Sequence, residues 1–122
     1  MNKEDMKGRT KAFALGVPAL SRSLGSSVES NVIARQMIRS GTSVGANYRA
    51  ACLARSRAYF ISKMGIVLEE VDESRYWMEL LVEDGLCRPQ DVADLMREAT
   101  ELTSLVAATV ITARERQKAG TS

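Results

Sequence analysis

The sequence contains no histidine and few aromatic residues, which make up 5% of its 122 positions. The absence of histidine removes the commonest general base, the commonest metal ligand and every imidazole-based catalytic triad. With so few aromatics, the core must be built from Leu, Val, Ile, Met and Ala. This choice suits helices, because unbranched side chains and Ala lose little rotamer freedom there. We therefore predict a helical protein that is not an enzyme and holds no cofactor or metal ion.

Long apolar runs and export signals are also missing. No stretch approaches the roughly 20 apolar residues that span a bilayer, and residues 1–11 are polar, without the apolar centre of a signal peptide. The only cysteines are Cys52 and Cys87, which fits a reducing compartment better than a disulfide-stabilised secreted protein. We expect a cytoplasmic protein with no membrane partner.

Charge is unevenly distributed along the chain, although the net charge at pH 7 is only +2. Residues 28–57 carry five arginines and one glutamate, whereas residues 58–84 carry seven acidic residues against one lysine and one arginine. Residues 1–27 are also basic, and the remainder of the chain balances to zero. The distribution predicts one basic face and one acidic face, and it points to charged partners.

Apolar residues return every three to four positions, which predicts helices. The ranges are about 5–24, 28–52, 57–84 and 89–117. Because all the connections are short, neighbouring helices must be antiparallel. The predicted fold class is all-α, a single domain over 1–122 that forms an antiparallel up-down-up-down four-helix bundle. The third helix is roughly 40 Å long at 1.5 Å per residue, so it separates Cys52 from Cys87 too far for a disulfide.

Several polar and small residues mark the helix ends. Ser26 with Glu29 three positions later fits a capping box at the start of the second helix. Ser56 is the expected N-cap of the third helix and Gly85 its left-handed terminator. Pro18 lies inside the first helix, where we expect it to produce a kink.

The second helix carries small and polar residues beside its apolar stripe. Gly41 and Gly45 each cost roughly 1 kcal/mol relative to Ala in a helix, so we expect them to allow close approach of another helix. Ser43 and Asn47 lie four positions apart at the edge of the apolar arc. We interpret them as a source of hydrogen bonds between helices, although a polar contact to a ligand is the alternative.

The second and third helices contain sequence motifs of a known family. The runs are 36–49 (QMIRSGTSVGANYR), 56–64 (SRAYFISKM) and 69–77 (EEVDESRYW), with weaker matches at 10–15 (TKAFAL) and 98–102 (EATEL). They resemble the four-helix bundle proteins related to 23S rRNA-intervening sequence proteins, a family that includes the accessory variability determinants of diversity-generating retroelements. The chain departs from the usual family pattern at Pro18 and at Ala50, where an aliphatic residue and a glutamate are common.

The resemblance carries expectations about assembly and role. It implies a bundle that assembles into a homopentameric ring, and in the retroelement proteins it implies a partnership with a reverse transcriptase and binding of nucleic acid through a basic surface. Most members of the family have no assigned activity. These expectations come from the resemblance and not from periodicity or composition.

Arginines form the basic face that such binding would use. On the second helix, Arg35, Arg39 and Arg49 fall within about an 80° arc opposite the apolar stripe, and Arg55 and Arg57 follow at its end. The guanidinium group is a fixed fork of donors that matches phosphate oxygens, so this set is the predicted nucleic-acid-binding site. The simplest alternative is a solvated face, because a helix with one apolar side must solvate the other and arginine does that well. A ladder of salt bridges between subunits is at least an equal alternative to nucleic-acid binding.

The acidic run on the third helix is the second candidate surface. Glu70, Glu73 and Trp77 share one side of the helix, and a tryptophan among carboxylates is typical of a subunit interface. We expect the basic helix of another copy as its partner. An all-carboxylate Mg²⁺ or Mn²⁺ site is formally possible, but solvated acidic helices are far more common. Arg75 lies within the apolar arc, and we interpret it as a structural ion pair with Asp72 or Glu79.

Two functional hypotheses follow. The first is a non-enzymatic, oligomeric helical scaffold or accessory protein that binds RNA or DNA phosphates through the basic face without reading sequence. The alternative is a protein-binding module that docks a partner enzyme such as a reverse transcriptase. A carboxylate metal enzyme is a third and weaker hypothesis.

Overall fold

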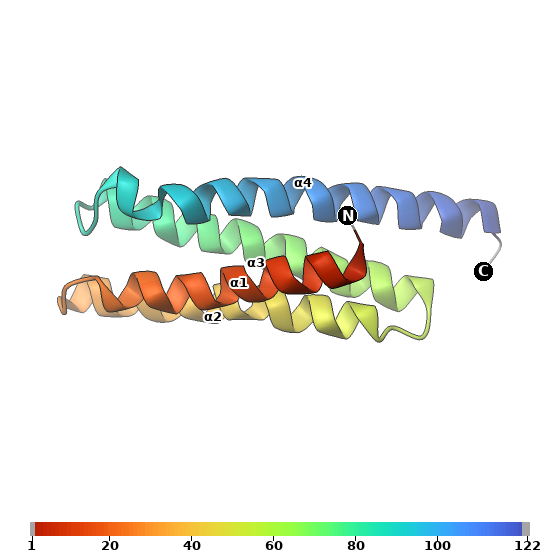
Figure 1. Ribbon diagram of the computed structural model, residues 1–122, viewed down its shortest axis with the longest axis horizontal. Coiled ribbons are helices and arrows are strands. Elements are labelled where there is room, and N and C mark those ends of the chain that lie inside the picture. Colours follow the sequence, from red (N-terminus) through yellow and green to blue (C-terminus); the bar gives the residue numbers. More distant parts are fainter. Residues whose placement is uncertain (1, 121–122) are drawn as a thin grey trace.

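The computed structural model describes residues 2–120, and this part of the chain is all-α. Each helix packs against the next along the chain, and the first packs against the last. These contacts are those of the predicted up-down-up-down bundle, and Figure 1 shows the helices lying side by side along one long axis. The helices are α1 (Lys3–Arg22), α2 (Val28–Cys52), α3 (Arg57–Glu83) and α4 (Pro89–Gly120).

The helices begin where polar side chains satisfy free backbone donors. Ser56 caps α3 as predicted, because its hydroxyl accepts a hydrogen bond from the Tyr59 amide at 3.1 Å. The predicted cap of α2 is wrong by one residue: Ser27 is the N-cap, and its hydroxyl accepts from the Ser30 amide at 3.0 Å. Ser30 thus occupies the position that a capping box gives to glutamate, and Glu29 is one position too early in the first turn to complete the box.

The helix ends differ slightly from the predicted ranges. The range 28–52 agrees with α2, and α3 ends at Glu83 where 84 was predicted. Gly85, at φ 73°, adopts the left-handed conformation expected after that end. Helix α1 runs through Pro18 as one element, and it begins and ends two residues earlier than predicted. Helix α4 continues to Gly120 instead of 117, because arginine, glutamine and lysine near its end all favour helix.

The core consists of aliphatic and methionine side chains from all four helices, joined by Phe13 and Tyr48. Val17, Val44 and Val71 are inaccessible to solvent. Leu81 of α3 is also completely buried. The bundle therefore closes around one continuous apolar interior.

Glycines let α1 lie close to its neighbours. A Cβ atom on Gly41 would lie 2.7 Å from Val17 Cγ2, and one on Gly45 would lie 3.3 Å from the Thr10 carbonyl oxygen. This confirms the close approach predicted from the two glycines of α2 and identifies α1 as the helix that approaches. On the other side, a Cβ on Gly16 would lie 2.8 Å from a methyl carbon of Leu95 in α4.

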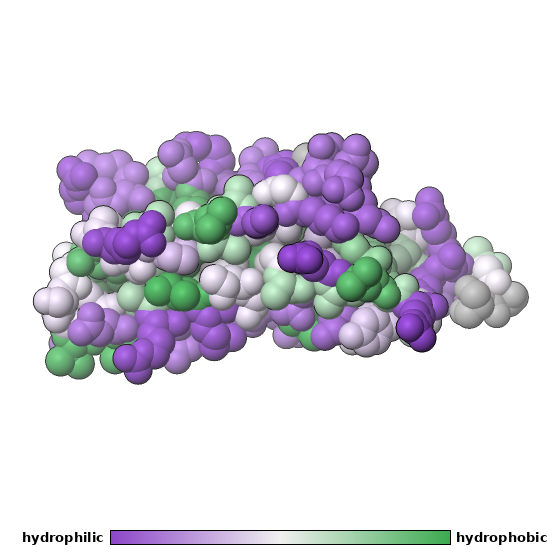
Figure 2. Space-filling model, turned by 60° about the horizontal axis from the view of Figure 1, so that its bottom comes forward, coloured by the Kyte–Doolittle hydropathy of each residue, from purple (hydrophilic) through white to green (hydrophobic). Residues whose placement is uncertain are grey.

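The surface of the bundle is largely polar. In the view of Figure 2, hydrophilic side chains cover most of the face and the hydrophobic ones are scattered among them. Among the described helices, none combines the length and the apolar character that a bilayer-crossing segment needs. Both cysteines are free thiols, and they lie near opposite ends of α3, in agreement with the predicted separation.

Candidate nucleic-acid interface

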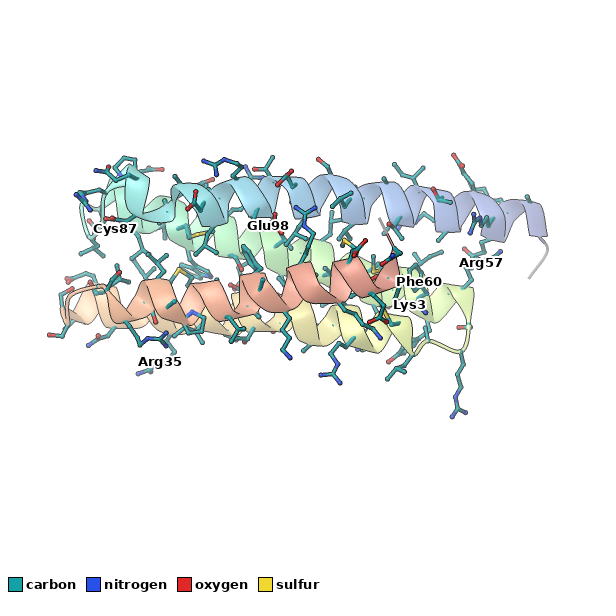
Figure 3. The ribbon with its side chains drawn as sticks, viewed as in Figure 1. Lys3, Arg35, Arg57, Phe60, Cys87 and Glu98 are labelled. Atoms are coloured by element: carbon teal, nitrogen blue, oxygen red, sulfur yellow. The ribbon has the colours of Figure 1, made fainter. Side chains whose placement is uncertain are left out.

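The predicted nucleic-acid-binding arginines spread over the length of the bundle. Figure 3 places Arg35 and Arg57 toward opposite ends, so they do not form a single patch. Arg57 is the first residue of α3 and is half-buried, whereas the other four are exposed. Helix α2 carries Arg35, Arg39 and Arg49, and the connection to α3 carries Arg55.

Arg39 differs from the other arginines because it pairs with two carboxylates of the same chain. Its Nη1 donates to Glu70 Oε2 at 3.0 Å, and its Nη2 donates to Glu73 Oε2. The Trp77 indole N–H donates to that same Glu73 oxygen at 3.1 Å. Glu70, Glu73 and Trp77 were expected to contact the basic helix of another copy, and the structure brings them to the basic helix of their own chain.

This network shifts the ionisation of its members. The Trp77 N–H, and after it the Arg39 guanidinium, stabilise the charged form of Glu73 and hold the pKa of its carboxyl below the usual value. The same contact, chiefly the hydrogen bond to Glu73, raises the pKa of Arg39. The network therefore joins α2 to α3. Because the guanidinium of Arg39 is paired with Glu70 and Glu73, Arg39 contributes less positive charge to the surface than Arg35 or Arg49.

A second ion-pair cluster, which was not predicted from the sequence, joins α1 to α4. Arg9 Nε donates to Glu98 Oε2 at 2.9 Å, and its Nη2 donates to Glu101 Oε2 at 3.2 Å. Because Glu98 and Glu101 are three positions apart, they lie on the same side of α4. That spacing indicates a paired acidic site on α4, but only the packing of α1 against α4 identifies Arg9 as the partner.

The predicted polar contacts inside the bundle need two corrections. Asn47 Nδ2 donates to the Ser43 carbonyl oxygen at 2.9 Å, so this pair bonds within α2 and not between helices. Ser40 of α2 and Ser74 of α3 instead form a buried hydrogen bond between helices, with their hydroxyl oxygens 2.9 Å apart. The small side chains of serine allow α2 and α3 to come close enough for this contact.

The predicted ion pair of Arg75 is wrong. Within residues 2–120, Arg75 forms no salt bridge with Asp72 or Glu79, and its buried Nε has no hydrogen-bond partner. Asp72 and Glu79 are both exposed, so their carboxylates are hydrated by solvent. The spacing along the helix would allow an ion pair between Arg75 and either acid. Nε of Arg75 is buried, however, whereas both carboxylates lie at the surface, so they do not meet.

One cleft gathers basic side chains from distant parts of the sequence. It has a volume of about 1080 Å³ and lies where α2 ends, α3 begins and α4 passes. Arg55 and Arg57 line it, as do Lys3 of α1 and Arg116 of α4. Lys3 and Arg116 were not predicted, because they stand near opposite ends of the chain and only the fold brings them together. No carboxylate is among the described residues that line this cleft.

Two carboxylates of the acidic run of α3 pair with donors of the same chain. Glu70 and Glu73 accept from Arg39, and Glu73 also accepts from the Trp77 N–H. Across the part of the chain that the structure describes, no group of three or more histidine, cysteine or acidic side chains is arranged to hold a metal ion.

Fold and surface together define the class: a small antiparallel four-helix bundle whose charged groups lie on its faces and at one end. Residues 3–108 match the sequence profile described as 23S rRNA-intervening sequence protein, and the chain belongs to that family. This confirms the resemblance drawn from the motifs of the second and third helices.

A solved structure supports the same assignment. It is a protein of unknown function from the S23 ribosomal protein family of Bacteroides thetaiotaomicron, and it is 34% identical to this chain with a TM-score of 0.83. The similarity covers 90% of this chain and 98% of that one. No curated protein matches the chain. The comparisons therefore establish the family and the fold, and the role must be argued from the surface.

Proposed function

We propose that this protein is a non-enzymatic, oligomeric accessory protein that binds the phosphates of RNA or DNA through its basic surface. The observation that carries the proposal is that Arg35, Arg49 and Arg55 are exposed and form no ion pair within residues 2–120. Arginine matches phosphate oxygens with a planar fork of donors. Such contacts hold the backbone of a nucleic acid but carry no sequence information, so binding is independent of base sequence.

Assembly into a homopentameric ring is part of this proposal, and the family resemblance is its source. Exposed apolar side chains support self-association: Val28 and Val32 lie one turn apart on α2 and are 75% and 55% exposed. Burying them against another copy removes apolar surface from water. A ring would repeat each basic surface around its axis, which raises the avidity of individually weak phosphate contacts.

The proposal is tested by an RNA shift assay together with mass determination by light scattering. Affinity for a mixed-sequence RNA should fall steeply as salt rises, because neutralised phosphates release counterions. Changing Arg35, Arg49 and Arg55 together to Glu should abolish RNA retention and leave the oligomeric mass unchanged. Binding that barely changes with salt contradicts the proposal.

A matched control separates local charge from net charge. Lys7, Arg88 and Arg97 each pair with an acid three positions away on or beside the same helix. Changing these three to Glu alters the net charge by the same amount but leaves the unpaired arginines in place. This variant should retain most RNA binding, and an equal loss in both variants would show that only total charge matters.

The second candidate is a protein-binding module that docks a partner enzyme such as a reverse transcriptase. Exposed apolar side chains favour it, above all Leu15 on α1 and Leu53 beyond α2, which are 65% and 81% exposed. The same experiment distinguishes the two. If the native protein retains no RNA at low salt, the docking module is the better account, and if the arginine variant dissociates into monomers, those residues hold the assembly together.

A further inference from the structure

The basic cleft exists because the helices differ in length. Helix α1 has 20 residues and α4 has 32. Figure 1 shows α4 projecting past the N-terminal end of α1, so its last turns have no α1 opposite them. The side chains that would face α1 there line the cleft instead, including Thr109, Thr112 and Arg116. The cleft is thus a consequence of the fold and not of a mobile loop.

The lining combines positive charge with an apolar wall. Lys3, Arg55, Arg57 and Arg116 supply the charge, and no carboxylate is found among the lining residues that the structure describes. Phe60 is half-buried and packs against the core, and it also lines the cleft together with small alanines. Figure 3 shows Lys3, Phe60 and Arg57 gathered at this end of the bundle. A ligand that fits must be anionic and must carry a flat apolar part.

We propose that this cleft holds an unpaired nucleotide of a single-stranded nucleic acid, with its base against Phe60 and its phosphates at Arg55, Arg57 and Arg116. The proposal rests on the proposed function, and it specifies where the nucleic acid binds and that the bound strand is single. Proteins that bind single strands combine a positive groove with an aromatic side chain on which a base lies. The volume of about 1080 Å³ is close to the upper end of small-ligand pockets, which span about 300–1,000 Å³.

Strandedness follows from the position of Phe60. Inside a duplex each base is covered by its neighbours in the stack, so no internal base face is free to lie on the ring. A duplex can therefore bind through its phosphates to arginines outside the cleft, such as Arg35 and Arg49, but its paired bases cannot lie on Phe60 or fill the cleft. Binding through surface charge alone predicts no such difference between single strands and duplexes, because both present phosphates.

The two cysteines provide an internal test of where the strand lies. Cys52 lines the cleft, and Cys87 lies at the other end of α3; both are half-buried free thiols. The protein is treated with N-ethylmaleimide with and without an oligothymidylate of about ten nucleotides, a length typical of single-strand sites. Modification of each cysteine is followed by peptide mass spectrometry. The single strand should slow modification of Cys52 by at least about fivefold and leave Cys87 unchanged.

A relaxed, covalently closed circular duplex, which has no terminal base pair, is the matched ligand. At concentrations where it binds to the same extent, it should leave the modification of Cys52 unchanged. Equal protection of Cys52 by both ligands, or no protection by a bound single strand, overturns the proposal. Protection of Cys52 by a polyglutamate peptide but not by the oligonucleotide would also overturn it, and would identify an acidic peptide as the ligand.

Two variants test the aromatic residue and a basic residue of the cleft separately. Phe60→Leu keeps an apolar side chain but removes the ring face, and it should weaken single-strand binding by at least about fivefold with little change for the duplex. Because Phe60 also packs on the core, Arg116→Gln, at an exposed position, serves as a second variant that spares the fold. Arg35→Gln, outside the cleft, is its control and should weaken both ligands alike.

The outcomes separate this inference from the proposed function. If Arg116→Gln and Arg35→Gln weaken single strands and duplexes equally, the cleft inference is wrong while phosphate binding stands. If the native protein binds neither ligand at low salt, both the inference and the proposed function are wrong. A selective loss of single-strand binding in Arg116→Gln supports both.

Discussion

Glu73 shows how a single side chain can join two helices and respond to pH. It accepts from Arg39 of α2 and from Trp77 of its own helix, and these donors keep the pKa of its carboxyl below the ordinary 4.5. Because the pKa is lower in the folded than in the unfolded chain, ionised Glu73 stabilises the fold above that value. This stabilisation is lost as the pH falls through the folded pKa.

Glu73→Gln should therefore change the pH dependence of stability. The variant should melt at a lower temperature than the native protein near neutral pH, and the difference should shrink as the pH falls through the lowered pKa of the Glu73 carboxyl, because the native carboxyl becomes protonated there. Thermal unfolding followed by circular dichroism across this range measures it. Glu69→Gln is the control, because Glu69 is exposed on the same helix and forms no ion pair in the described part of the chain. A difference that stays constant with pH contradicts the assignment.

Arg75 forms no salt bridge in the part of the folded chain that the structure describes. Its Nε is buried without a hydrogen-bond partner, and an unsatisfied buried donor costs about 1–3 kcal/mol. Arg75→Met keeps most of the length and apolar volume and removes the donor. We expect the free energy of unfolding, measured in urea, to rise by roughly 1 kcal/mol. A clear loss of stability would mean that Arg75 finds a partner in the assembled protein, which the single chain does not contain.

At the scale of elements, the approach of α1 to its neighbours depends on glycine. A Cβ on Gly41 would lie within 2.7–3.1 Å of three Val17 side-chain carbons, whereas a Cβ on Gly65 in α3 would meet nothing within 4 Å. Both glycines lie inside helices, so both substitutions by Ala gain about 1 kcal/mol of helix propensity. Only at Gly41 must α1 move away to make room.

This pair of glycines gives opposite expectations for one chemical change. Gly65→Ala should stabilise the bundle by roughly 0.5–1 kcal/mol. Gly41→Ala should destabilise it by about 1–2 kcal/mol, because overpacking outweighs the gain in propensity. Urea unfolding of both variants measures the difference. If Gly41→Ala is as stable as Gly65→Ala, α1 does not approach α2 as closely as described.

Helix boundaries and buried stripes could be predicted because they depend on residues a few positions apart. The ends of α2 and α3 were predicted to within one residue for this reason. The pairing of charges could not be predicted, since it depends on the register between helices. Spacing along α3 suggested acids for Arg75, but the bundle leaves Arg75 without them and gives Arg39 to Glu70 and Glu73. The cap at Ser27 was missed because adjacent serines make equally good caps.

At the scale of the whole molecule, the cleft was the part of the candidate site least accessible from sequence. Arg55 and Arg57 could be assigned from their neighbourhood to α2, but Lys3 and Arg116 join them only because α1 and α4 meet at that end. The relative lengths of the helices decide where the end of the bundle stays open. Helix α1 has the predicted length but begins two residues earlier, and α4 is three residues longer than predicted, so the sequence misplaced this end of the bundle by less than one helical turn.

The same geometry predicts the behaviour of the two thiols under oxidation. Cys52 and Cys87 lie at opposite ends of α3, whose 27 residues span roughly 40 Å, whereas a disulfide requires Cα atoms within about 7 Å. Diamide should therefore form no bond between these cysteines within one folded chain, as non-reducing peptide mapping can establish. In concentrated urea the same treatment should form the bond readily, because the unfolded chain brings the thiols together. An internal disulfide formed in the native protein would contradict the up-down order of the helices, since only a different path of α3 could bring its two ends together.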